Sequence, residues 1–280
     1  MKKTIELIKN KKQKHEKIIM LTAYDYPLAK LVDEVGVDII LVGDSLANVV
    51  LGLESTREVG MEVMIHHAKA VRRGVKQALL VGDMPYDSYQ VDSQQAVMNA
   101  KRFIEEAGCE AVKLEWFDEC VMVAQKIGEA GIAVMGHVGL TPQTAENLGG
   151  FKVQGKDALS AQKIIEHARA LERAGCFSIV LECIPLQIAK IITEELAIPT
   201  IGIGAGVYCD GQVLVTHDLL GLSDRMQLKF VKQYVALNDN IKSGLKQYTK
   251  DVTEGRFPDD NHSYHINQGE LEKLKAGKIL

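Results

Sequence analysis

The chain has 280 residues, of which 46% are hydrophobic and 25% charged, with a formal net charge of −4. This balance is typical of a soluble globular protein and favours neither nucleic acid nor an anionic membrane as a partner. No apolar run approaches the roughly 20 residues of a membrane span, and the five cysteines form no C-x-x-C pair, so we expect a cytoplasmic protein with reduced thiols.

Strand-like and helix-like patterns alternate along the chain. Apolar runs of about 4–8 residues between helical patterns are typical of buried parallel strands. We predict strands at residues 18–21, 38–42, 78–82, 111–114, 133–136, 178–181, 199–203 and 212–215. Helical spacing predicts helices at residues 28–35, 61–73, 93–106, 119–130, 160–173 and 185–196, several of them ended by a glycine.

This count and rhythm favour a (β/α)8 barrel over a doubly wound open sheet. Such barrels fill about 200–250 residues as one unit, so we predict a single domain over residues 1–280. Lysines around Leu7 and Ile8 indicate a short surface helix before the first strand. From about residue 224 we expect a C-terminal extension with a helix to about residue 248, a polar stretch and a short charged helix.

Five predicted strands end on a polar group that is able to take part in chemistry. Asp44 and Asp83 follow glycines, Glu115 and Glu182 close their apolar runs directly, and His137 follows Gly136. Parallel sheets and barrels place their active sites at the carboxyl ends of the strands. The five groups therefore predict a ring of ligands and bases around one site.

Asp44, Asp83 and Glu115 are the candidate metal ligands. Carboxylates that converge on one point repel each other unless a cation lies between them, and hard oxygen ligands favour Mg²⁺. The alternative is that each carboxylate caps the following helix or pairs with a surface lysine. That alternative suits a single aspartate better than a set placed at successive strand ends.

The other candidates have two interpretations each. Lys113 faces the same side of its strand as Glu115, so it either forms a buried ion pair or binds a substrate carboxylate, and spacing supports both equally. Glu182 is either a partly desolvated general base or a carboxylate stabilised at a helix start. His137 is flanked by glycines that indicate close packing at a site, although a lone histidine is more often structural.

Several ordered stretches of the chain resemble one known family, the ketopantoate hydroxymethyltransferases. Together they run in the same order from about residue 4 to residue 265, which makes the set far more specific than any one motif. They are Leu21–Asp25, Val42–Ser45, Ala111–Glu115, Val134–His137, Gly139–Gln143, Lys152–Lys156, Ile179–Cys183, Ile201–Gly206 and Cys209–Gly211.

The resemblance implies a (β/α)8 barrel of the phosphoenolpyruvate/pyruvate type, assembled as a homodecamer. It implies transfer of a hydroxymethyl group from 5,10-methylenetetrahydrofolate to 3-methyl-2-oxobutanoate, giving 2-dehydropantoate for pantothenate synthesis. The implied site residues, matched motif by motif, are Asp44, Asp83 and Glu115 for Mg²⁺, Asp44, Ser45, Asp83, Lys113 and His137 for the 2-oxo acid, and Glu182 as proton acceptor.

The chain departs from the family pattern near these motifs. Trp116 and Phe117 follow Glu115 where small residues are usual, and Ala47–Asn48 replaces a more usual Gly-Met. These changes bear on the pocket rim and on the folate contacts, and they leave the charged set intact. Two other functions remain open, namely a lyase or mutase for another Mg²⁺-chelated 2-oxo acid, and a non-catalytic scaffold, against which the retained charged set argues.

Overall fold

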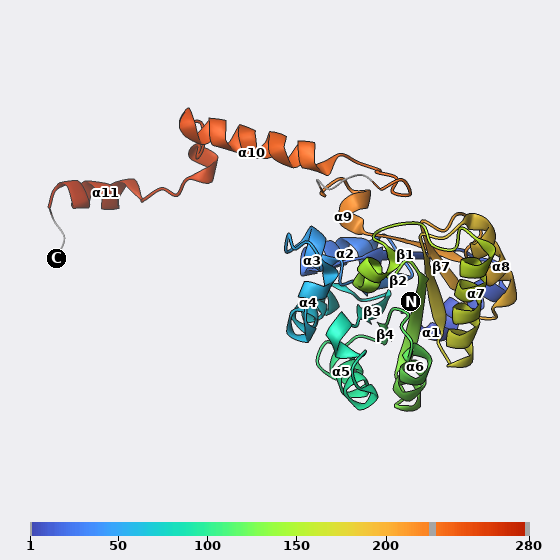
Figure 1. Cartoon of the computed structure of the whole chain (residues 1–280). Helices are drawn as coiled ribbons and strands as arrows, with labels where there is room; N and C mark the ends of the chain where they lie inside the picture. Colours follow the sequence, from blue (N-terminus) through green and yellow to red (C-terminus); the bar gives the residue numbers. More distant parts are fainter. Residues whose placement is uncertain (1, 224–227, 278–280) are drawn as a thin grey trace.

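The computed structural model describes residues 2–223 and 228–277, and its centre is a closed barrel (Figure 1). Eight parallel strands pair in chain order, and β1 pairs with β8 to close the barrel. The predicted (β/α)8 barrel is therefore confirmed. The strands are β1 (Ile18–Thr22), β2 (Ile39–Val42), β3 (Leu79–Asp83), β4 (Ala111–Lys113), β5 (Ala133–Gly139), β6 (Ser178–Glu182), β7 (Thr200–Ile203) and β8 (Gly211–Leu214).

Helices cover the outside of the barrel after most strands. Aspartates begin several of them, because a carboxylate at the N-cap accepts a free backbone N–H, as Asp25 does from Leu28. The main helices are α2 (Tyr26–Glu34), α4 (Met61–Gly74), α5 (Ser93–Glu105), α6 (Cys120–Glu129), α7 (Ala158–Arg173) and α8 (Leu186–Glu195). Short turns of helix lie in the loops: α3 (Leu46–Val49), η1 (Thr56–Glu58), η2 (Tyr86–Ser88) and η3 (Pro142–Leu148).

Two apolar layers hold the barrel together. One fills the space between the strands and the surrounding helices, and the other fills the barrel interior. Helix α1 (Ile5–Gln13) closes the amino end, where Ile8 is fully buried in the interior layer. The predicted helix is therefore present, with one face buried, and Lys11 joins it to the barrel through an ion pair of 2.6 Å with Asp38.

The ring of helices is open beside β7 and β8. Residues 204–210 join these strands without a helix, and β8 is followed only by the short α9 (Thr216–Leu219). Ile19 on β1 is paired in register with Gln212 on β8, and its side chain is 53% exposed. Strands of a parallel barrel are normally buried on both faces, so this part of the outer face lacks its usual cover.

The C-terminal extension runs away from the barrel (Figure 1). It contains α10 (Leu237–Thr253), η4 (Asp260–His262) and α11 (Gln268–Lys275), and none of the described residues from 228 onward is buried. The helix expected to begin near residue 224 begins only at Leu237. Residues 224–227 lie outside the described residues, and the backbone N–H groups of Tyr234 and Leu237 donate to carbonyls of α9 instead of to a helical turn.

Within the described part of the chain, no helix combines the length and apolar character that crossing a bilayer requires.

Candidate active site at the carboxyl end of the barrel

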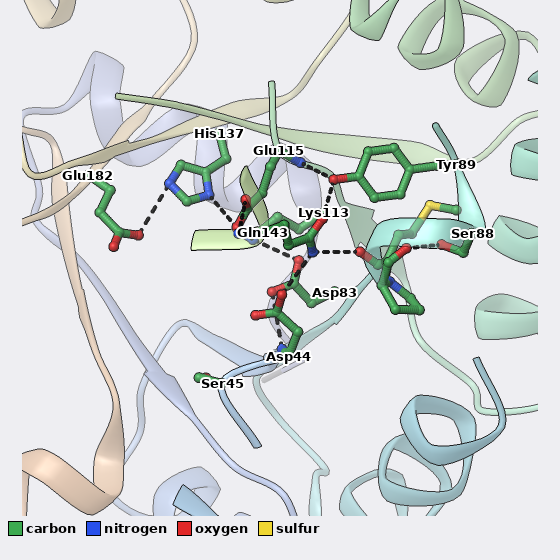
Figure 2. Close-up of polar contacts among 12 residues, drawn as sticks. Asp44, Ser45, Asp83, Ser88, Tyr89, Lys113, Glu115, His137, Gln143 and Glu182 are labelled. Carbon is green, nitrogen blue, oxygen red and sulfur yellow. Dashed lines mark hydrogen bonds and ion pairs between the residues drawn. The ribbon is translucent and has the colours of Figure 1, made fainter. Parts of the chain in front are cut away.

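The structure brings the predicted strand-end groups together at one end of the barrel (Figure 2). Asp83 and Glu182 are the last residues of β3 and β6, and Asp44 and Glu115 each lie two residues beyond β2 and β4. His137 was predicted just past a strand end but lies inside β5. Gly82 makes room on the outer face of β3, where an added Cβ would lie 2.3 Å from the ring of Phe103 on α5.

Lys113 pairs with Asp83 inside the barrel. Its Nζ lies 2.7 Å from Oδ1 of Asp83 and 3.9 Å from Oε1 of Glu115, and these side chains are at most 5% exposed. Burial disfavours the charged amine, but Asp83, Glu115 and Asp44 outweigh burial and raise the pKa of Lys113. The buried ion pair that the sequence allowed is therefore present, while binding of a substrate carboxylate remains a prediction.

The cluster carries more negative than positive charge when its members are ionised. Asp44, Asp83 and Glu115 supply three carboxylates against the one ammonium of Lys113. Burial and the charges of Asp83 and Glu115 raise the pKa of Asp44 well above its usual value. Burial also raises the pKa of Asp83, against the opposing effect of Lys113. A further cation would relieve this repulsion.

The donor set fits Mg²⁺ in the manner typical of that ion. No three His, Cys, Asp or Glu side chains among the described residues are arranged to ligate one ion directly. Mg²⁺ usually needs only one or two protein carboxylates, because water and substrate oxygens complete its shell. Asp44 and Asp83 are such a pair, since the backbone N–H of Asp44 donates to Oδ2 of Asp83 at 3.3 Å.

His137 links the cluster to the opening of the barrel. Its Nδ1 lies 3.5 Å from Oε1 of Glu115 and its Nε2 lies 3.2 Å from Oε2 of Glu182. Burial and Lys113 lower its pKa, but the two carboxylates prevail and raise the pKa of His137 to about 9. The side chain of Glu182 is 15% exposed, more than the other members, so it is the carboxylate nearest to solvent.

Ser45 lies beside Asp44 at the start of α3 (Figure 2). Its Oγ is 2.8 Å from the hydroxyl of Tyr24, a fully buried residue whose pKa is raised by burial. This contact holds the serine hydroxyl next to the carboxylate cluster.

Two residues of the site, Gln143 and Tyr89, were not singled out from the sequence. Gln143 lies in η3 and donates to Asp44, and Tyr89 follows η2 and donates to Gln143. Both are 1% exposed. The only signal for Gln143 was its place in the Gly139–Gln143 motif directly after β5, and Tyr89 had none.

A hollow with a volume of about 510 Å³ lies among the loops that follow β3, β4 and β5 and the first half of α7. Trp116, Phe117 and Lys163 line it, and the indole of Trp116 stacks on the ring of His167 at a centroid distance of 3.7 Å. The pair Trp116 and Phe117, which departs from the family pattern, therefore lines this hollow. None of the carboxylates of the cluster lines it.

Known proteins resemble the chain over nearly its whole length. A family model described as ketopantoate hydroxymethyltransferase matches residues 2–260. A 3-methyl-2-oxobutanoate hydroxymethyltransferase of Syntrophomonas wolfei subsp. wolfei is 54% identical over 271 residues, which cover 97% of this chain and 98% of that protein.

Solved structures share the fold at low identity. Phosphonopyruvate hydrolase in complex with oxalate and Mg²⁺ has a TM-score of 0.62 at 13% identity and covers 99% of this chain and 96% of that one. A 2,3-dimethylmalate lyase, a PEP mutase/isocitrate lyase superfamily member, has a TM-score of 0.60 at 14% identity and covers 99% of both chains. These likenesses show that both proteins share the (β/α)8 barrel fold with this chain.

Proposed function

Because the chain belongs to the ketopantoate hydroxymethyltransferase family, we propose that it makes 2-dehydropantoate for pantothenate synthesis. It would transfer a hydroxymethyl group from 5,10-methylenetetrahydrofolate to 3-methyl-2-oxobutanoate with the help of Mg²⁺. The observation that carries this proposal is the buried carboxylate and lysine cluster, with Glu182 at its open side. Such an arrangement suits the binding of an anionic acid beside a base.

Asp44 and Asp83 would hold the Mg²⁺, and Glu115, the third predicted ligand, would add its negative charge to the same site. When bound, Mg²⁺ supplies Lewis-acid stabilisation of the negative charge that develops on the keto oxygen of the substrate. Lys113 supplies positive charge next to Asp83, and Ser45 supplies a hydroxyl next to Asp44. Together they would bind the 2-oxo acid and orient its C3 toward the opening.

Glu182 would take the proton from C3. It is the most exposed carboxylate of the site, and its Oε2 lies 3.2 Å from Nε2 of His137. The pKa of His137, raised to about 9 by Glu115 and Glu182, leaves a positively charged ring opposite the carboxylate of Glu182 at neutral pH. The C3 carbanion would then form a bond to the methylene carbon of the folate as one of the two C–N bonds of that carbon breaks. Water would replace the second nitrogen, so that the hydroxymethyl group stays on C3 and tetrahydrofolate leaves.

The assay of this function needs only the purified chain. With Mg²⁺, 3-methyl-2-oxobutanoate and 5,10-methylenetetrahydrofolate, we expect 2-dehydropantoate to form, as detected by mass spectrometry. A chelator should abolish its formation, and excess Mg²⁺ should restore it. Product formed equally well in chelator would contradict Mg²⁺ dependence, and turnover of other 2-oxo acids without folate would indicate a lyase or mutase instead.

The proposed assembly is a homo-oligomer, a decamer by family resemblance. Two features support an oligomer: the outer face beside β7 and β8 lacks a helix, and α10 carries an exposed apolar stripe at helical spacing. The stripe consists of Ile241, Leu245, Tyr248 and Val252. A second copy of the chain would cover this stripe, since a helix with an apolar face needs a packing partner.

Removing residues 237–280 is therefore expected to give an assembly of fewer subunits, each with an intact barrel. None of the described residues in this segment is buried against the barrel, so its loss leaves the core unchanged. Light scattering coupled to gel filtration measures the mass, and circular dichroism reports the fold. The double variant Ile241→Gln/Leu245→Gln should act in the same direction, whereas Lys246→Gln on the polar face should not. An unchanged number of subunits in the assembly of the truncated chain would rule out this role of residues 237–280.

A further inference from the structure

We propose that Gln143 and Tyr89 are positioning residues that fix the orientation of two carboxylates, Asp44 and Glu115, for cation binding. The proposal rests on the Mg²⁺ site of the proposed function. It is carried by a buried hydrogen-bond network that joins η2, η3 and the ends of β2 and β4 (Figure 2).

Gln143 contacts both carboxylates at once. Its side-chain Nε2 donates to Oδ2 of Asp44 at 2.8 Å, and its backbone N–H donates to Oε2 of Glu115 at 3.0 Å. One residue thus occupies one oxygen of each carboxylate. The second oxygen of Glu115, Oε1, faces Lys113 and His137 at 3.9 and 3.5 Å, on the inner side of the cluster. Among the described residues no hydrogen bond occupies Oδ1 of Asp44, so in the proposal this oxygen faces the cation.

The orientation of the Gln143 amide is determined by its neighbours. Nε2 also donates to the carbonyl oxygen of Met84 at 3.0 Å, and Oε1 accepts from the hydroxyl of Tyr89 at 2.5 Å. A carbonyl and a carboxylate only accept hydrogen bonds, so an amide turned by 180° would set its oxygen against two acceptors. Asp44 therefore always meets an N–H donor.

Tyr89 locks this amide from the other side. Its hydroxyl donates to Gln143 and accepts from the backbone N–H of Glu115 at 3.2 Å. The phenol thus connects the backbone of one carboxylate with the side chain that holds the other. All four residues are at most 5% exposed, so water does not replace a lost contact at low cost.

The network matters for binding because the carboxylates repel each other. Asp44 lies next to Asp83 and Glu115, and each would turn away from the others without a donor that holds it. Partners that orient the ligands of a metal typically change metal affinity by about 10–100-fold. We therefore place Gln143 and Tyr89 in the role of orienting groups, without contact to the reacting atoms.

The test measures Mn²⁺ binding by electron paramagnetic resonance, with Mn²⁺ as the probe of the Mg²⁺ site. Gln143→Met keeps the side-chain volume and the backbone donor but removes the amide. We expect its Kd for Mn²⁺ to rise about 10–100-fold. At saturating Mn²⁺, C3 proton exchange of the 2-oxo acid in D₂O should return to within a few-fold of the wild-type rate, so the metal requirement changes more than kcat.

Tyr89→Phe removes only the hydroxyl group from the network. It is the test of the proposal if Gln143→Met does not fold. We expect a rise in Kd in the same direction, smaller than for Gln143→Met. Gln94→Met, on the exposed side of α5, is the matched control and should bind as wild type does. Asp44→Asn should lose Mn²⁺ binding altogether.

The outcomes separate this inference from the proposed function. An unchanged Kd in both folded variants, with Asp44→Asn defective, would overturn the positioning role and leave the metal site standing. A wild-type protein that binds no Mn²⁺ would overturn both. A reduced kcat at saturating Mn²⁺ with unchanged Kd would show that Gln143 acts on the reaction rather than on cation binding, and would likewise overturn the inference.

Discussion

Glu182→Gln is expected to slow C3 proton exchange of 3-methyl-2-oxobutanoate in D₂O by about 10²–10⁴-fold, the usual contribution of a general base. The amide keeps the size of the side chain but has no basic oxygen. Binding of the acid should remain, because Lys113, Ser45 and the aspartates are untouched. Nuclear magnetic resonance follows the exchange, and calorimetry measures the binding, both in the presence of Mg²⁺ and without folate.

The geometry around Glu182 makes this variant informative. Oε2 of Glu182 lies 3.2 Å from Nε2 of His137, and glutamine keeps a side chain of the same length and shape there. Loss of exchange would thus report lost basicity rather than a collapsed site. Glu119→Gln, an exposed carboxylate at the start of α6, is the control and should exchange normally. Exchange at the wild-type rate in Glu182→Gln would show that another group takes the proton.

The barrel was predictable because its signals are local. Each strand is a short apolar run, and the strand ends of a parallel barrel meet at one face, so the sequence positions of Asp44, Asp83 and Glu115 translate directly into proximity. The glycines before Asp44 and Asp83 supported this inference, since a glycine at a strand end leaves the backbone open to an approaching ligand.

Gln143 and Tyr89 escaped prediction because their role depends on tertiary contacts. Gln143 is 99 residues from Asp44 in sequence, and Tyr89 is 54 residues from Gln143. A glutamine or a tyrosine in a predicted loop is as compatible with an exposed side chain as with a buried hydrogen-bond donor. The same reason applies to the stacking of Trp116 on His167, where only the fold shows that the two rings meet.

The predicted start of the C-terminal helix was wrong for a different reason. Helical spacing continues through residues 228–236, but the N–H groups of Tyr234 and Leu237 find acceptors on α9. A tertiary hydrogen bond thus competes with helix formation, and periodicity carries no information about it.

Lys113→Met is expected to lower the free energy of unfolding by about 3–5 kcal/mol in a metal-free buffer, because it leaves buried carboxylates without their cation. The ammonium is 5% exposed and lies 2.7 Å from Asp83, so solvent does not screen the loss. Urea unfolding of the chelated protein measures the change. Lys101→Met, an exposed lysine of α5, is the control and should cost little.

The pH dependence of Lys113→Met should have a defined sign. Burial and the charges of Asp83 and Glu115 already raise the pKa of Asp44 above its value in the unfolded chain. Loss of the Lys113 ammonium raises this pKa further. The folded variant then binds more protons than the unfolded chain, so its stability falls as pH rises through that raised pKa and is recovered at lower pH.

A second substitution separates unpaired charge from lost packing. Asp83→Asn/Lys113→Met removes both partners of the ion pair, so it should be more stable than Lys113→Met alone, since one uncompensated carboxylate is gone. Saturating Mg²⁺ should also stabilise Lys113→Met more than the wild type, because the ion supplies the missing positive charge to Asp44 and Asp83. A single variant as stable as wild type in chelator at neutral pH would mean that the carboxylates are already neutralised by protons, and that Lys113 is not the charge that balances them.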